Sequence, residues 1–165
     1  MDPSLITIIQ CRNIHFITLQ KKLIKRRSRK SKLELDVITL IGSLVILMHD
    51  DAAGPSTLSI EADGTMNIDN LIWHTSQAAA AAGSINLEPY HERAVQLGMR
   101  AHSEENELVE LLGHFEEFER LEDPYYFEEW NGNQRSETYE LICYAINLKE
   151  SLMRLITSYE TLLKI

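Results

Sequence analysis

The C-terminal part of the chain carries the most regular hydrophobic pattern in the sequence. Its members are spaced alternately four and three residues apart: Leu141, Ala145, Leu148, Leu152, Leu155, Tyr159 and Leu162. This heptad spacing is typical of a helix that packs along one seam against other helices. Further apolar residues beside the seam widen the face, which favours a bundle or a multi-helix coiled coil. The pattern therefore predicts a helix, and it leaves open whether the seam packs inside its own chain or against a dimer partner.

Two further helices are expected upstream of that seam. Residues 68–82 read as a short helix that ends at Gly83, because glycine readily takes the left-handed conformation found after helices. Ser103 is a suitable N-cap for the next helix, whose end is expected before Pro124. The apolar stripe of that helix consists of Leu108, Leu111, Leu112, Phe115, Phe118 and Leu121.

The sequence of the N-terminal part of the chain predicts a helix followed by two strands. Residues 5–32 have apolar residues at roughly helical spacing, whereas residues 44–48 are β-branched and apolar enough for a buried strand. Residues 57–61 alternate as a half-buried strand does, and a hairpin over residues 58–68 is the competing register because Asp63-Gly64 is a turn signal. The expected fold class is α+β, with a basic helix on a two-stranded antiparallel hairpin followed by a helical coiled-coil or bundle region.

This reading divides the chain into three regions. Residues 1–62 form the helix and hairpin, residues 63–102 are an intervening region, and residues 103–165 are the helical association region. Residues 37–48 lack charge, but a bilayer-spanning helix needs about twenty apolar residues. A buried strand or helix therefore explains residues 37–48 better than a membrane hairpin does.

Positive charge is concentrated near the N-terminus. Residues 1–32 have a net charge of +8, whereas residues 33–165 have a net charge of −17. Eight basic residues lie within twelve positions that contain no acid: Lys21, Lys22, Lys25, Arg26, Arg27, Arg29, Lys30 and Lys32. Several cations along one helix bind nucleic-acid phosphates, and such a run is also a nuclear import signal. The run therefore predicts contact with nucleic acid, recognition by a nuclear import receptor, or both.

Little in the sequence points to catalysis, a cofactor or a metal. No nucleophile, metalloprotease or phosphate-loop motif is present, and the two cysteines form no CxxC pair. Glu88 and His91 have the spacing of one di-metal motif, but such sites need two of these motifs and two further glutamates. Glu110, His114 and Glu117 share a helical face, which is more often a solvated acidic surface. We therefore expect no enzyme activity, no small-molecule substrate, no cofactor and no metal.

Several short motifs, taken together, resemble those of plant MADS-box transcription factors of the pollen-type MIKC-star class. Lys25-Arg26-Arg27-Ser28 is similar to that family's KRRS core, and Lys32, Asp36, Leu40, Val45 and Leu47 fall at corresponding positions. Residues 68–72 resemble the family's IEDVI, residues 85–93 its INLPEHDR, and residues 122–127 its EPDPxxF. Residues 147–163 resemble the end of its keratin-like helix. The resemblance extends over most of residues 20–165.

The resemblance implies a nuclear, dimeric, DNA-binding regulator of transcription that acts on A/T-rich CArG-like elements. The basic run would contact DNA, and the C-terminal seam would select a homodimeric or heterodimeric partner among related factors. Residues 1–11 contain no Lys or Arg where this family has a basic arm. That difference favours an alternative function, an interaction protein that dimerises with related factors without binding DNA. A second alternative is a peripheral membrane protein whose basic segment contacts anionic lipids.

Overall fold

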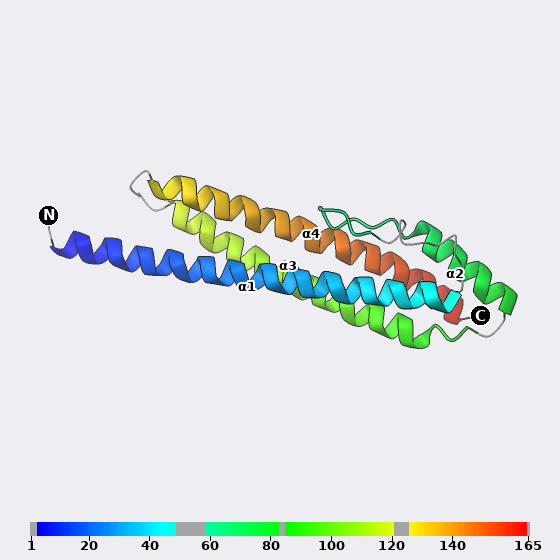
Figure 1. Cartoon of the computed structure of the whole chain (residues 1–165). Helices are drawn as coiled ribbons and strands as arrows, with labels where there is room; N and C mark the ends of the chain where they lie inside the picture. The colour runs from blue at the N-terminus through cyan, green and yellow to red at the C-terminus, as the bar shows by residue number, and fades with distance from the viewer. Residues whose placement is uncertain (1–2, 49–58, 83–84, 121–125, 165) are drawn as a thin grey trace.

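The computed structural model describes residues 3–48, 59–82, 85–120 and 126–164 of the chain. It contains four helices, α1 (Pro3–Met48), α2 (Asp69–Ala82), α3 (Glu88–Arg120) and α4 (Tyr126–Leu163). The three long helices lie side by side along one axis, with α3 running opposite to α1 and α4 (Figure 1). The short helix α2 lies at the end of the molecule where α1 and α4 end (Figure 1).

The three long helices pack together because each carries a seam of alternate three- and four-residue spacing. On α1 the buried seam residues are Phe16, Leu19, Leu23, Leu33, Val37, Leu40 and Leu44. On α3 they are Ala94, Leu97, Ala101, Glu104, Leu108, Leu111, Phe115 and Phe118. The α4 seam is the heptad pattern predicted from the sequence. Two hydrophobic clusters result, one around Phe16 and Phe115 and one around Val37 and Leu148.

The predicted α+β fold is wrong, since the described residues contain no strand. Residues 44–48 continue α1, because Leu44 follows Val37 and Leu40 on the same buried face. Ile60 and Met66 form an isolated antiparallel bridge around the Asp63-Gly64 turn, which is all that the described residues retain of a hairpin. Residues 57 and 58 of the expected second strand lie outside the described residues.

The predicted helix boundaries have mixed outcomes. The short helix over residues 68–82 is confirmed by α2, and its expected end residue Gly83 lies outside the described residues. Ser103 is not an N-cap, because α3 begins at Glu88 and runs without interruption across residues 102 and 103. Leu121 and Pro124 lie outside the described residues. Residues 37–48 are helical, and those from 37 to 47 are partly buried. None of the helices in the described part of the chain has the length and apolar character to cross a membrane.

The segment between α1 and α2 is tied to α4 by a tight turn. Gly64 has a φ of 89°, and a Cβ atom at this position would lie 2.4 Å from the backbone oxygen of Tyr144. Asn147 of α4 donates a hydrogen bond from Nδ2 to the Asp63 backbone oxygen at 2.7 Å. Within the turn, the Thr65 hydroxyl donates to Asp63 and lowers the pKa of that carboxyl group. A glycine is therefore required here both for the left-handed backbone and for the close approach to α4.

Candidate nucleic-acid interface

The eight basic residues of α1 point in different directions around the helix. Arg26 and Lys30 fall on the buried seam, because they continue its spacing between Leu23 and Leu33. Lys21, Lys22, Lys25 and Lys32 are exposed, and so are Arg27 and Arg29. The basic run is therefore divided between an inner set that packs against α3 and α4 and an outer set that faces solvent.

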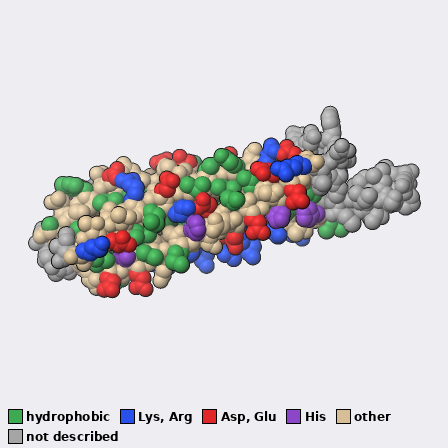
Figure 2. Space-filling model, turned by 180° about the vertical axis from the view of Figure 1, so that it is seen from behind, with side chains coloured by type: hydrophobic (Ala, Val, Ile, Leu, Met, Phe, Trp, Pro, Cys, Tyr) green, Lys and Arg blue, Asp and Glu red, His purple; other side chains and the backbone are tan. Residues whose placement is uncertain are grey.

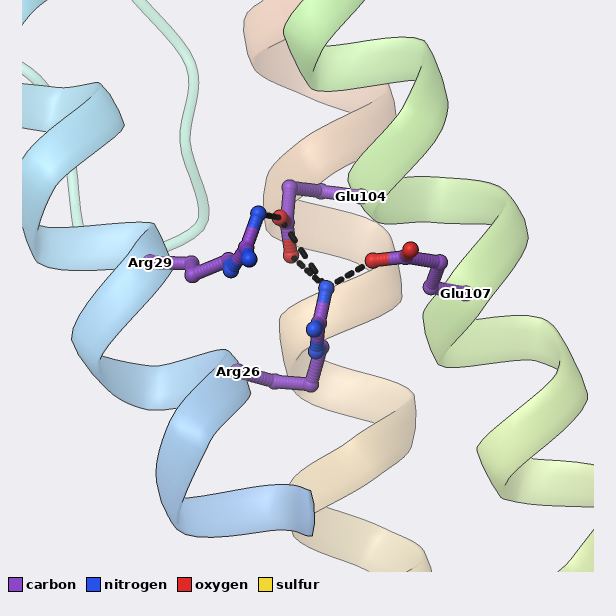
Figure 3. A network of polar contacts seen from close by, with 4 residues as sticks. All are labelled: Arg26, Arg29, Glu104 and Glu107. Atoms are coloured by element: carbon purple, nitrogen blue, oxygen red, sulfur yellow. Dashed lines mark hydrogen bonds and ion pairs between the residues drawn. The ribbon is translucent and has the colours of Figure 1, made fainter.

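Arg26 lies in a network of charged groups between α1 and α3 (Figure 3). Its Nη1 donates to both carboxylate oxygens of Glu104 at 3.1 Å, and the same atom pairs with Glu107. Only 11% of each side chain is exposed for Arg26 and Glu104. Arg29 approaches Glu104 from the solvent side, with 3.8 Å between Nη1 and Oε1. The network neutralises a buried glutamate and makes Arg26 unsuitable as a free phosphate ligand.

Arg27 and Lys30 are held by α4. Arg27 forms a hydrogen-bonded ion pair with Glu137, with 2.8 Å between Nη2 and Oε2. The Lys30 ammonium lies 4.4 Å from the centre of the Tyr144 ring. The Tyr144 hydroxyl donates to Glu34 at 2.5 Å, and burial together with this carboxylate raises the pKa of Tyr144. These contacts give Arg27 and Lys30 a structural role in joining α1 to α4.

The remaining cations form a row on the outside of α1. Lys22, Lys25, Arg29 and Lys32 are spaced three, four and three residues apart, so they share one face over about 15 Å. Lys21 lies beside this row. None of Lys21, Lys22, Lys25 and Lys32 forms an ion pair with an acidic residue in the described part of the chain. We call Lys21, Lys22, Lys25, Arg29 and Lys32 the outer basic row.

Two grooves between α1 and α3 border the outer basic row. One, of about 350 Å³, is lined by Arg29, Lys32, Arg100 and Ser103 together with Glu104. Arg100 also donates to Asp36 at 2.6 Å, and this hydrogen bond lowers the pKa of the Asp36 carboxyl group. The second groove, of about 230 Å³, combines Lys22 and Lys25 with Glu107 and Glu110. The α3 side of the row is therefore partly acidic, whereas its solvent side is not.

The predicted dimerisation residues lie inside the chain's own core. Leu141, Ala145, Leu148, Leu152, Leu155 and Tyr159 are each at most 8% exposed, and Leu162 packs partly buried against the same cluster. They contact the seams of α1, α3 and α2 rather than solvent. Burial of Tyr159 raises the pKa of its hydroxyl group to about 12. The hydroxyl oxygen of Thr75 lies 3.3 Å from the hydroxyl oxygen of Tyr159.

The histidines considered as metal ligands are dispersed. His91 pairs with Glu160 of α4 at 3.4 Å, and His114 lies 4.0 Å from Glu110 on its own helix. In the parts of the chain that the structure describes, no three His, Cys, Asp or Glu side chains are grouped to hold a metal. Acidic side chains are instead spread along the molecular face drawn in Figure 2, with hydrophobic side chains between them.

The structural partners of the basic run could not be identified from the sequence alone. Glu104 stands on the α3 seam, three residues after Ala101 and four before Leu108. This spacing was the available signal, and a charged residue on a seam indicates a buried partner of opposite charge. Comparison with known proteins gives no further guide, because no family model, no curated protein and no solved structure matches this chain.

Proposed function

We propose that the chain is a non-catalytic helical module that binds nucleic acid through the outer basic row of α1. The observation that carries the proposal is a set of four exposed lysines that form no ion pair with an acidic side chain among the described residues. The rest of the chain is strongly acidic, so these lysines do not serve general solubility. Lysine is a compact charge that suits phosphate oxygens, and it provides no planar fork for reading base edges.

The expected binding mode is contact with the phosphate backbone of duplex DNA. A duplex carries about nine phosphate charges, both strands counted, over about 15 Å of its axis, so the row can find phosphate contacts without one sequence register. Readout of CArG elements was an implication of the family resemblance, and the described residues do not form the α+β fold that the resemblance implied. The proposal therefore includes no preference for a particular base sequence, and the module would act as an associated regulator rather than as the reader of a DNA site.

The acidic groups of α3 limit how DNA can approach. Glu107 and Glu110 border Lys22 and Lys25 in the smaller groove, and they repel phosphates on that side. DNA must therefore contact α1 from its solvent side. Non-specific binding of this kind is expected in the range of about 10⁻⁴ to 10⁻⁶ M at physiological salt.

A salt titration tests this proposal. Full-length protein is titrated against a labelled duplex, and a plot of log K against log salt is expected to have a slope of about −3.5 for four phosphate contacts. Replacing Lys21, Lys22, Lys25 and Lys32 with alanine should abolish binding, because the phosphate ligands are removed. The matched control replaces the same four residues with arginine, which keeps the charge and should keep the binding.

Two results would refute the proposal. One is a wild-type slope shallower than about −1.5, which corresponds to fewer than two phosphate contacts. The other is equal binding by the alanine variant and the wild type. A folded state for all three proteins is checked by circular dichroism, and it is expected because the four lysines are exposed.

Nuclear localisation is part of the same proposal. The outer lysines remain accessible to an import receptor, whereas Arg26 and Arg27 are held by Glu104 and Glu137. The fourfold alanine variant, fused to a fluorescent carrier above the passive size limit of the nuclear pore, should spread into the cytoplasm. Unchanged nuclear accumulation of that variant would contradict a role for the row in import.

A further inference from the structure

Helix α1 carries a second apolar surface, on the side that faces away from the bundle. It consists of six aliphatic residues that are each between 42% and 73% exposed: Ile14, Ile17, Ile24, Leu35, Ile38 and Ile46. We call these six residues the outer stripe. Single exposed aliphatic residues are ordinary on protein surfaces, whereas an aligned set along one helix is not.

Five of the six outer-stripe residues lie on a heptad spacing, which four non-aliphatic residues interrupt. Starting at Ile14, alternate steps of three and four residues pass through Ile17, Lys21, Ile24, Ser28, Ser31, Leu35, Ile38 and Gly42. Each of these positions precedes a core-seam position by two residues, which is a rotation of about 200° around the helix. The stripe therefore lies opposite the core, and it extends over about 48 Å from Ile14 to Ile46.

The flanks of the outer stripe are positively charged. Residues 14–33 contain no Asp or Glu, and Lys21, Lys25 and Lys32 lie on or beside the stripe. The first acids of α1 are turned to other helices, since Glu34 accepts a hydrogen bond from Tyr144 and Asp36 accepts one from Arg100. Between residues 14 and 33, the outer face of α1 therefore carries aliphatic, cationic and neutral groups but no acidic group.

From this arrangement we propose that the outer stripe docks an amphipathic helix of a partner protein whose aliphatic seam is flanked by Asp and Glu. Aliphatic residues at seam positions interdigitate between two helices, and charges beside the seam select the partner by sign. Lys21, Lys25 and Lys32 would then pair with the acidic flanks. Ser28 and Ser31, in the middle of the stripe, leave room for larger apolar residues of the partner.

A second copy of this chain fits the outer stripe poorly. Two α1 helices packed through their stripes would bring the lysines of both copies together around Ser28, and like charges across an interface are strongly unfavourable. A flat lipid surface also fits poorly. A strict seven-residue repeat drifts by about 20° per heptad around a straight helix, so the stripe winds and only another coiling helix can follow it throughout.

Synthetic peptides test this proposal directly. The probe is a peptide of four heptads with Ile and Leu at the seam positions and Glu on both flanks, which keeps the free peptide from pairing with itself. The control peptide has Lys in place of every Glu. Titrated against the full chain, the acidic peptide should bind with a Kd of about 10 μM, and the lysine peptide should bind at least about tenfold more weakly.

A matched pair of variants locates the binding surface. Replacing Ile17, Ile24, Leu35 and Ile38 with serine should weaken binding of the acidic peptide by at least about tenfold, because these residues form the centre of the stripe. The control replaces Val109 and Met153, which are each 51% exposed on α3 and α4, with serine and should leave binding unchanged. Both variants should remain folded, because all six side chains face solvent.

Three outcomes would overturn the proposal. The first is acidic-peptide binding that is absent or is unaffected by the stripe variant. The second is binding of the wild type, but not of the stripe variant, to vesicles containing phosphatidylserine, which would assign the stripe to a membrane surface. The third is a wild-type dimer in analytical ultracentrifugation that the stripe variant disperses, which would assign the stripe to a second copy. Lys21, Lys25 and Lys32 also belong to the outer basic row, so the partner helix and DNA would compete for them. The stripe variant keeps all of these lysines and should keep DNA binding, so the two proposals fail separately.

Discussion

Arg26 of α1 and Glu104 of α3 face one another at seam positions of their two helices. Leu23 precedes Arg26 on its seam, and Leu108 follows Glu104 on the other. Nη1 of Arg26 lies 3.1 Å from both carboxylate oxygens of Glu104. This ion pair separates the two hydrophobic clusters of the core. A largely buried ion pair between these two seams fixes how far α1 can slide along α3, because any other register would bury both charges without partners.

Removing one partner of this pair should destabilise the protein strongly. Glu104→Ala leaves the Arg26 guanidinium largely buried with only Glu107 as its partner, and Arg26→Ala leaves Glu104 with only the distant Arg29. Each variant is expected to lose about 3 kcal/mol of unfolding free energy in urea denaturation. The double variant Arg26→Leu with Glu104→Leu should recover most of that loss, since it joins the two hydrophobic clusters. If the double variant is less stable than both single variants, the pair is not the register element described above.

The sequence predicted the helices best where the seam is purely apolar. The α4 seam and the helix over residues 68–82 were identified from spacing and from turn residues. The first helix was predicted only over residues 5–32, and its apolar spacing stops at Leu23 because Arg26 and Lys30 interrupt it. Only the partners on α3 and α4 show that these two charged residues are inside, and a single sequence does not reveal which distant residues meet.

The predicted hairpin failed for a related reason. Residues 37–48 are rich in β-branched side chains, which locally favour strands. In the folded chain, Val37, Leu40 and Leu44 pack on α3 and α4 as one helical face, and this burial outweighs the local preference. The division of the basic run into an inner and an outer set requires the helix packing to be known.

Substitution of Gly64 should test the turn that ties the α1–α2 segment to α4. Gly64→Ala is expected to destabilise the protein by more than about 1 kcal/mol, because φ is 89° and the new Cβ would lie 2.4 Å from the Tyr144 oxygen. Gly113→Ala is the matched control. Gly113 is an exposed residue within α3, and no atom lies within 4 Å of the position that an added Cβ would take. Alanine at this position should therefore stabilise the helix by about 0.5–1 kcal/mol. Equal effects of the two substitutions in thermal denaturation would contradict the turn geometry.

Truncation of the α4 seam should affect folding rather than association. Leu148 is fully buried within the chain's own core, so Leu148→Ala is expected to lower the unfolding free energy by about 2–5 kcal/mol. The sedimentation coefficient of the folded protein should not change, because the side chain is buried within its own chain. The exposed neighbour Met153 provides the control, since Met153→Ala should change stability by less than about 0.5 kcal/mol. If the wild type is a dimer and Leu148→Ala converts it to a folded monomer, the seam mediates association between chains, and this prediction is wrong.

The two buried tyrosines should resist ionisation in alkaline solution. Desolvation raises the pKa of Tyr159 to about 12, and burial with the Glu34 carboxylate also raises the pKa of Tyr144. Because the pKa values are raised above the ordinary value of about 10, folding favours the neutral phenols. This contribution to stability is complete below pH 10 and is lost as the pH rises above it. An alkaline spectroscopic titration of the folded protein checks this expectation. When the absorbance spectrum of Tyr144→Phe is subtracted from that of the wild type, the difference should show no phenolate signal at pH 10. The same holds for Tyr159→Phe. A difference signal at pH 10 would mean that the hydroxyl group reaches water, which would contradict the packing of α1 and α2 against α4.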